Sequence, residues 1–164
     1  MSGDAKHETW TEVVDITQHK GNDDRLHWAV YKLPHHCSYT AIGPDRNTGA
    51  SPNKTPPTKQ VAWLCENQSS NRCIVVSPSK PIPSKGSNED SDDQPPHRQA
   101  ANYYMEDVVN PKDGKFLVTM EEPSVDKPEP IVITIDGNGA KRSSAGALGF
   151  AAITGTSSPR AGSQ

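Results

Sequence analysis

Residues 26–38, LHWAVYKLPHHCS, join a short apolar run directly to a proline and two histidines. Trp, Val, Tyr and Leu in a run of this length are typical of a buried strand, so we expect a strand over 26–33 that is closed by Pro34. The end of a strand in an α/β sheet is a common place for a functional site. The sequence therefore predicts a strand with a candidate site, His35 and His36, immediately after it.

The segments on either side of this strand alternate between helical and strand patterns. The spacing of apolar residues predicts helices over 6–20, 58–68 and 97–109, and strands over 72–77, 115–122 and 130–137. This alternation indicates the α/β fold class. The connection between the last two strands is compatible with a hairpin and equally with a short crossover.

The apolar content is low for one domain of 164 residues, at 32%. A domain of this length removes about 70% of its extended-chain surface from water, so we expect part of the chain to stay unfolded or to rely on another polypeptide. Residues 80–96 are rich in proline, serine and acid, which predicts a flexible insertion. Residues 138–164 are rich in Gly, Ala, Ser and Thr, which predicts a disordered tail with Lys141 and Arg142 as a solvated basic pair. The ordered domain is thus expected within residues 1–137.

Charge and cysteine content exclude several classes of protein. Lys and Arg number 17 against 20 Asp and Glu, so no overall basic field attracts nucleic acid nonspecifically. No window approaches the roughly 18 consecutive apolar residues of a membrane helix, and the first residues do not resemble a secretory signal, which predicts no membrane partner and a cytoplasmic location. The three cysteines show no CxxC spacing, so neither a disulfide scaffold nor a zinc ribbon is expected.

The adjacent pair His35 and His36 points to metal chemistry, because neutral imidazole is the commonest metal ligand in proteins. A ligand at a strand end is held by rigid backbone while the metal stays open to substrate. Neighbouring residues of an extended chain point to opposite sides, so at most one of the two is expected to ligate while the other supports it or touches substrate. Two histidines at the solvent rim, without a metal, are the alternative.

Two separated motifs resemble a known family. Gly3-Asp4, then a helix, then a strand that ends in Pro34-His35-His36-Cys37-Ser38 resembles the second half of the metallo-β-lactamase (αββα) hydrolase fold, nearest to the competence-protein hydrolase domains. Cys37 stands where that family carries glycine. Gln94-Pro95-Pro96-His97, which opens a helix after a strand, is similar to the later His-Pro segment of the same domains. The resemblance covers roughly residues 2–110.

The resemblance implies roles for four residues. Asp4 would be the carboxylate that bridges two metal ions, zinc or manganese, and His35 or His36 would be the last histidine ligand of the second metal, with His35 slightly favoured. The metals would activate water to attack a phosphodiester or related ester, so a nucleic acid or a nucleotide is a candidate substrate. His97 would contact substrate or donate a proton to the leaving group, and an exposed histidine at a helix start is the alternative.

The chain also departs from the family pattern. The defining His-x-His-x-Asp-His cluster does not occur in the sequence, which leaves one or two ligands per metal where three or four are required. We therefore expect the chain to be inactive alone and to need a complementing N-terminal half. A half fold is also expected to leave Trp28, Val30, Trp63 and Val75 short of burial. The alternatives are a non-catalytic α/β interaction module that contacts a partner protein through 80–96 and the tail, or a truncated gene fragment.

Overall fold

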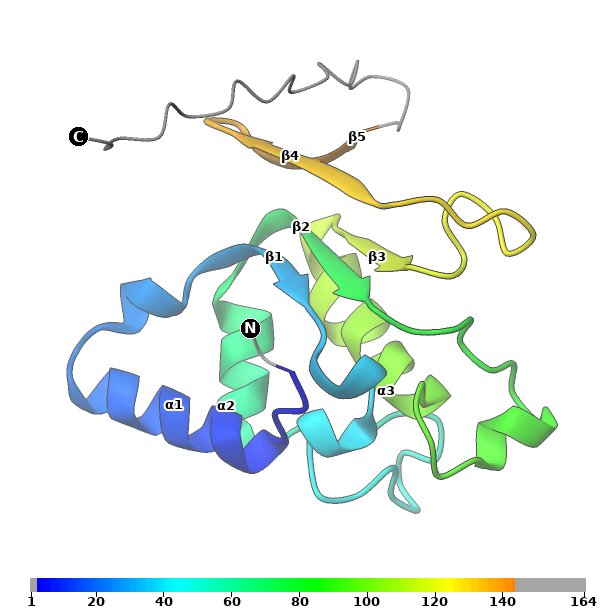
Figure 1. Ribbon diagram of the computed structural model, residues 1–164. Coiled ribbons are helices and arrows are strands. Elements are labelled where there is room, and N and C mark those ends of the chain that lie inside the picture. The colour runs from blue at the N-terminus through cyan, green and yellow to red at the C-terminus, as the bar shows by residue number, and fades with distance from the viewer. Residues whose placement is uncertain (1–2, 144–164) are drawn as a thin grey trace, which may run out of the picture.

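The computed structural model describes residues 3–143, which form an α/β fold around a three-stranded parallel sheet (Figure 1). The strands lie in the spatial order β1, β2, β3, with bounds Trp28–Lys32, Ser69–Ser77 and Lys115–Val118. Helix α1 (His7–His19) precedes the sheet, while α2 (Lys59–Ala62) and α3 (Arg98–Tyr103) connect successive strands and continue into π-helical turns at Trp63–Asn67 and Tyr104–Val109. Parallel neighbours require such crossovers. The predicted α/β class is confirmed.

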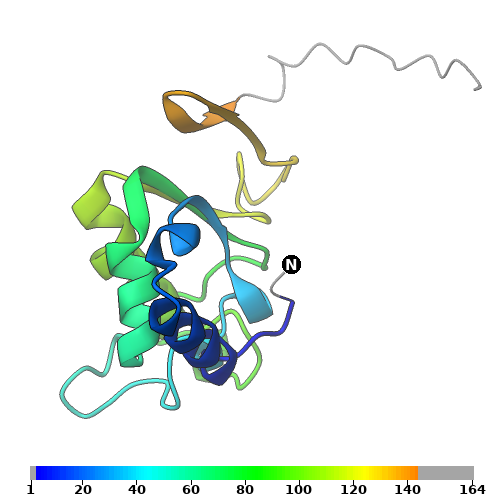
Figure 2. The same cartoon turned by 90° about the vertical axis from the view of Figure 1, so that its left-hand side faces the viewer.

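The core lies between one face of the sheet and the crossover helices, which occupy the same side of the sheet in Figure 2. Val75 of β2 is fully buried there against Tyr103 and Tyr104 and the rest of this cluster. The expectation that Val75 lacks burial is therefore wrong, because residues of this chain already cover it. Trp28 is half-buried, and its indole Nε1 donates a hydrogen bond of 2.9 Å to the carbonyl of Leu64.

Helix α1 follows the predicted boundaries and ends just before Gly21, whose φ of +65° suits glycine. Val14 is fully buried, whereas Ile16 is 54% exposed. One narrow stripe of the helix therefore packs on the core and the opposite side stays open. Within residues 3–143 no helix is long and apolar enough to cross a membrane.

A separate antiparallel hairpin follows the sheet and corrects the predicted tail. Strands β4 (Val132–Asp136) and β5 (Gly139–Ser143) pair only with each other, so the connection after β3 is neither of the two arrangements expected. The Asp136 carboxylate accepts a hydrogen bond of 2.7 Å from the backbone N–H of Asn138, and Gly139 has a φ of +108°. The prediction of a disordered tail from residue 138 is therefore wrong for residues 138–143, because Asp-Gly-Asn-Gly is a hairpin turn sequence. Residues 144–164 lie outside the described part.

The proline-rich segment 80–96 has mostly irregular backbone with one short helical turn at Asn88–Ser91. Asp90 anchors it, because its carboxylate accepts hydrogen bonds from Arg98 Nε at 2.8 Å and from the backbone N–H of Gly86 at 3.0 Å. At the start of the segment, the N–H of Ile82 donates to the Glu121 carboxylate at 2.8 Å. These contacts place the segment beside α3, and its flexibility stays a prediction.

Candidate functional site

The histidine pair lies in a tight turn at the carboxyl end of β1. The ladder continues one residue past the strand, since the Leu33 N–H donates to the Val76 carbonyl at 2.9 Å, and Pro34 then turns the chain. His35, His36 and Cys37 follow with φ of +49°, +53° and +65°. Non-glycine residues rarely adopt this left-handed conformation, and such strain gathers at functional sites.

Cys37 adopts the conformation that glycine would adopt more readily. Its side chain is 1% exposed and belongs to the core cluster, so burial of the thiol holds the turn in place. Burial also raises the pKa of the Cys37 thiol to about 12, which keeps it protonated at neutral pH. Cys37 is therefore a structural residue rather than a nucleophile or metal ligand.

The structure brings the Gly3-Asp4 motif to this turn. The His35 N–H donates a hydrogen bond of 2.9 Å to the Gly3 carbonyl, although the two residues lie far apart in the sequence. The Asp4 side chain is exposed. Among residues 3–143, no hydrogen bond or ion pair joins the Asp4 carboxylate to either imidazole. The backbone of the first motif thus meets the second motif, while its carboxylate stays open to solvent.

His36 has the bonding pattern of a metal-ligating histidine. Its Nδ1 lies 2.7 Å from the Pro78 carbonyl oxygen, which can only accept, so Nδ1–H is the donor and Nε2 is the ring nitrogen left for another partner. A backbone carbonyl on the second ring nitrogen is the usual support for such a ligand. The side chain is exposed and borders a cavity of about 560 Å³ whose lining includes Lys80, Pro95 and Met120.

His35 is held differently from its neighbour. Its Nδ1 lies 3.2 Å from the Thr40 hydroxyl, which in turn lies 3.0 Å from the Ser38 hydroxyl. Ser38 caps the next helical turn by accepting from the Thr40 N–H at 3.3 Å. The two imidazoles therefore bond to different elements, and they do so from a left-handed turn rather than from the extended chain that the sequence suggested. Thr40 was not singled out in the sequence, where it is one polar residue among many.

His97 is buried beside the turn, with 3% of its surface exposed. Its backbone N–H donates to the Cys37 carbonyl at 3.1 Å, and its Nδ1 accepts from the Tyr39 N–H at 3.3 Å. The Tyr39 ring lies edge-on to the imidazole, with 5.0 Å between ring centroids. The alternative of an exposed histidine is therefore wrong, because the turn and Tyr39 cover the ring.

The protonation state of His97 follows from these contacts. Burial, followed by the positive charge of Arg46, lowers the pKa of His97 to about 4. The ring is therefore neutral at pH 7, with its proton on Nε2, which is buried without a hydrogen-bond partner in the described residues. A neutral imidazole donates a hydrogen bond more readily than it delivers a proton. Because the ring is buried, both roles predicted for His97 toward a substrate stay predictions, and its observed contacts join α3 to the histidine turn.

Arg46 is a further site residue that sequence reasoning did not find. Its guanidinium lies 5.5 Å from the centre of the Tyr39 ring and 3.8 Å from the Asp93 carboxylate, and it donates to the Asp92 carbonyl. It therefore links the histidine turn to the segment 80–96. The length of the loop after the turn was the only available signal, because loops of about 20 residues in compact domains are often functional.

Within residues 3–143, no three His, Cys, Asp or Glu side chains gather closely enough to hold a metal ion. His36 and Asp4 thus have the chemistry of ligands, but the described residues do not complete a metal site. Comparison with protein-family models, curated proteins and solved structures gives no match. The chain is therefore described as an α/β protein, and its candidate site is identified from the positions of its residues alone.

Proposed function

We propose that this chain contributes part of the metal site of a hydrolase that cleaves a phosphodiester or a related ester. The hydrogen bond from His35 to Gly3 carries the proposal, because it brings together the two motifs on which the family resemblance rests. Polypeptide other than residues 3–143 must supply the remaining ligands, since the described residues hold no complete set. The specific metallo-β-lactamase fold is part of this proposal.

His36 is the stronger ligand candidate on geometry, which reverses the slight preference for His35. Its side chain is exposed, the Pro78 carbonyl fixes the ring through Nδ1, and Nε2 is the ring nitrogen left for a metal. Asp4 supplies a nearby exposed carboxylate, and His35 supports the turn through Thr40. Zinc suits a histidine-rich ligand set and manganese a carboxylate-rich one. When bound, either ion would stabilise the negative charge that develops on a phosphoryl oxygen.

The surroundings of His36 suit an anionic substrate. Lys80 lines the same cavity and supplies a positive charge, while Pro95 and Met120 add apolar surface to its wall. His97 is buried and is not among the residues that line this cavity, so it takes no part in substrate binding here. The lining residues bind and orient, and none of them is placed to act as a strong acid at neutral pH.

Zinc titration of the full chain tests the proposal. We expect one weak zinc site by isothermal titration calorimetry, and His36→Ala should weaken it by about 10-fold or more, the usual scale for loss of a ligand or its support. Asp4→Asn should weaken it less, because the charge is exposed. His19→Ala is the matched control, since His19 is an exposed histidine at the end of α1.

Two results would overturn the metal proposal: no zinc binding by the full chain, or binding that His36→Ala and His19→Ala change equally. Either result leaves the non-catalytic interaction module as the better description. Manganese in place of zinc with the same variants decides the metal preference, because loss of Asp4 should then matter more than loss of His36.

A further inference from the structure

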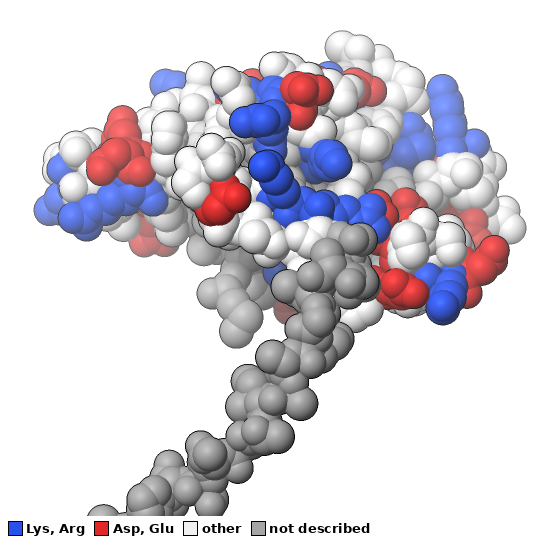
Figure 3. Space-filling view, turned by 90° about the horizontal axis from the view of Figure 1, so that it is seen from above, with Lys and Arg blue, Asp and Glu red and all other residues white. Residues whose placement is uncertain are grey.

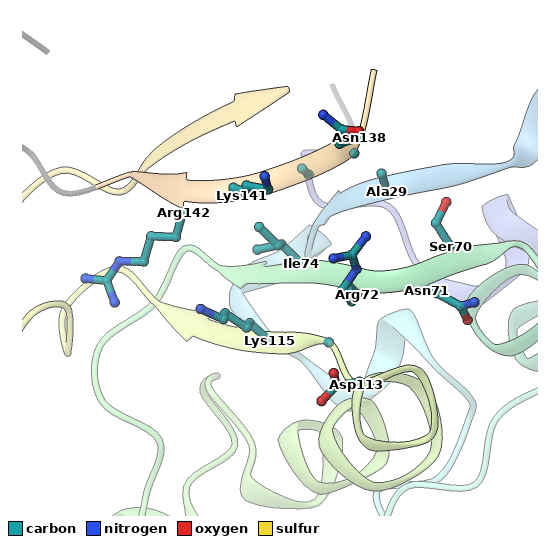
Figure 4. A pocket seen from close by; sticks show the side chains of 13 residues that line it. Ala29, Ser70, Asn71, Arg72, Ile74, Asp113, Lys115, Asn138, Lys141 and Arg142 are labelled. Carbon is teal, nitrogen blue, oxygen red and sulfur yellow. The ribbon is translucent and has the colours of Figure 1, made fainter. Parts of the chain in front are cut away.

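A second cavity, of about 610 Å³, lies at the opposite, amino-terminal end of the sheet (Figure 4). The first residues of β2 and β3 form one side, and the turn and strand β5 of the hairpin form the other. The hairpin lies over this end of the sheet in Figure 1, whereas the histidine turn follows the carboxyl end of β1. The two sites are thus separated by the length of the strands.

The backbone at this cavity departs from a regular ladder. Trp28 pairs with Ser69 and Val30 with Ile74, so several residues of β2 face a single residue of β1 and bulge out. Arg72 lies in this bulge with a φ of +58°, and Asp113 ends the turn before β3 with a φ of +51°. A bulge redirects a side chain out of the ladder, and here it points Arg72 toward β5 (Figure 4).

The cavity carries an excess of positive charge. Arg72, Lys115 and Lys141 line it and are exposed, and no carboxylate within residues 3–143 lies within 4.0 Å of their charged groups. Asp113 is the one carboxylate among the lining residues, which leaves two net positive charges. Arg142 also borders the cavity, but it pairs with Glu122 and points away in Figure 4. Figure 3 shows Lys and Arg side chains gathered in the middle of this face.

The remaining lining residues suit the organic part of a ligand. The partly exposed Ala29 is the accessible apolar residue beside the cations, Ile74 behind it is 2% exposed, and the amides of Asn71 and Asn138 add neutral donors and acceptors. A few polar groups around an apolar patch, in a cavity of this volume, are typical of small-molecule sites. Among the lining residues there is no aromatic ring, so stacking of successive nucleic-acid bases has no platform here.

We propose that this cavity binds a phosphate monoester of nucleotide size. The phosphate would contact Arg72, Lys115 and Lys141, and the organic part would lie on Ala29 and the two asparagines. A phosphate monoester carries about 1.5 to 2 negative charges at neutral pH, which matches the excess charge of the cavity. The site uses none of the metal-site residues, so its test is independent of the test of the proposed hydrolase.

Titration of the full chain with AMP tests this site. Arg72→Gln combined with Lys141→Gln should weaken AMP binding by about 10-fold or more, because two charge-assisted contacts are lost. Arg25→Gln combined with Lys59→Gln removes the same charge from exposed positions elsewhere and should leave the affinity unchanged. Lys115→Gln is a further variant should the first fail to fold, which circular dichroism reports.

Other ligands identify the chemistry that is recognised. AMP should bind more tightly than inorganic phosphate and than adenosine, since each of these lacks one half of the contacts. The proposal is overturned if adenosine binds as tightly as AMP. It is also overturned if the control variant Arg25→Gln/Lys59→Gln weakens AMP binding as much as Arg72→Gln/Lys141→Gln does. A single-stranded oligonucleotide that binds more tightly than AMP also overturns it, because the cavity is then part of a nucleic-acid surface. His36→Ala should not change AMP binding, which separates this result from the zinc titration.

Discussion

The two ends of the parallel sheet differ in how their residues are held. At the carboxyl end, His97 and Cys37 are buried and hydrogen bonds join the histidine turn to α3. At the amino end, Arg72 and Lys115 are exposed, and the lining carries charge instead of core contacts. The same three strands therefore present one site that depends on packing and one that depends on electrostatics. Substitutions at the carboxyl end should therefore change mainly the free energy of unfolding, and substitutions at the amino end should change mainly the affinity for a ligand.

The two ends share one backbone feature. All five non-glycine residues with positive φ in the described chain lie at these ends: His35, His36, Cys37, Arg72 and Asp113. Each such residue costs about 1–3 kcal/mol unless the surroundings compensate. At the carboxyl end, the buried thiol and the hydrogen bonds compensate. At the amino end, the Asp113 N–H donates to the Asn110 carbonyl at 3.2 Å and the Gly114 N–H donates to the Val109 carbonyl at 3.0 Å, so backbone hydrogen bonds hold the turn before β3.

The largest expected effect separates the core of the carboxyl end from the hairpin of the amino end. Leu33→Ala should lower the free energy of unfolding by about 3 kcal/mol, because a fully buried leucine leaves a cavity. Ile135→Ala should change it by less than about 0.5 kcal/mol, since Ile135 is 69% exposed. Urea denaturation followed by circular dichroism measures both. Equal losses in the two variants would show that the hairpin belongs to the same cooperative unit.

Acidification should act on the carboxyl end alone. The pKa of His97 falls from an unfolded value near 6.5 to about 4 in the folded chain, so the unfolded state binds more protons between these values. The stabilisation is complete above pH 6.5 and is lost as the pH falls toward 4. Between pH 7 and pH 5 we expect a loss of about 2 kcal/mol in the free energy of unfolding.

His97→Gln is the control for this effect, because glutamine keeps a polar group of similar reach and does not titrate in this range. The variant should be less stable at pH 7 and nearly independent of pH between 7 and 5. The AMP phosphate titrates near pH 6, so AMP affinity is compared at each pH between the unmodified chain and His97→Gln, and equal values in the two chains support the separation of the two ends. A steep pH dependence that persists in His97→Gln would place the responsible group elsewhere.

The sequence was sufficient to predict the alternation of helices and strands, because local apolar spacing carries that information. It did not predict the β4–β5 hairpin, since residues 138–143 offer little apolar weight and the Asp-Gly turn was outweighed by composition. It also underestimated the burial of Val75. That burial depends on how α2 and α3 close over the sheet, which is a property of the assembled fold.

The candidate site was only partly accessible to sequence reasoning. His35, His36 and His97 could be named because histidines next to a strand end or a helix start are conspicuous. The difference between the ligand geometry of His36 and the supporting role of His35 depends on Pro78 and Thr40, which only the fold brings into contact. The basic cavity was missed for the same reason, since Arg72, Lys115 and Lys141 come from three distant segments.

The smallest expected effect concerns the segment 80–96, which the pair Arg98–Asp90 holds at the carboxyl end. The two side chains are 11% and 12% exposed and lie 2.8 Å apart, and the hydrogen bond from Arg98 lowers the pKa of Asp90. Arg98→Gln should cost about 1 kcal/mol, because the carboxylate loses its charged donor. Amide hydrogen exchange in 80–96 should rise while exchange in the hairpin stays the same. Lys127→Gln removes an exposed ion pair with Glu129 and should change neither. Unchanged exchange in 80–96 after Arg98→Gln would mean that the segment is already mobile, as its composition predicts, and that the carboxyl-end site is open to solvent on this side.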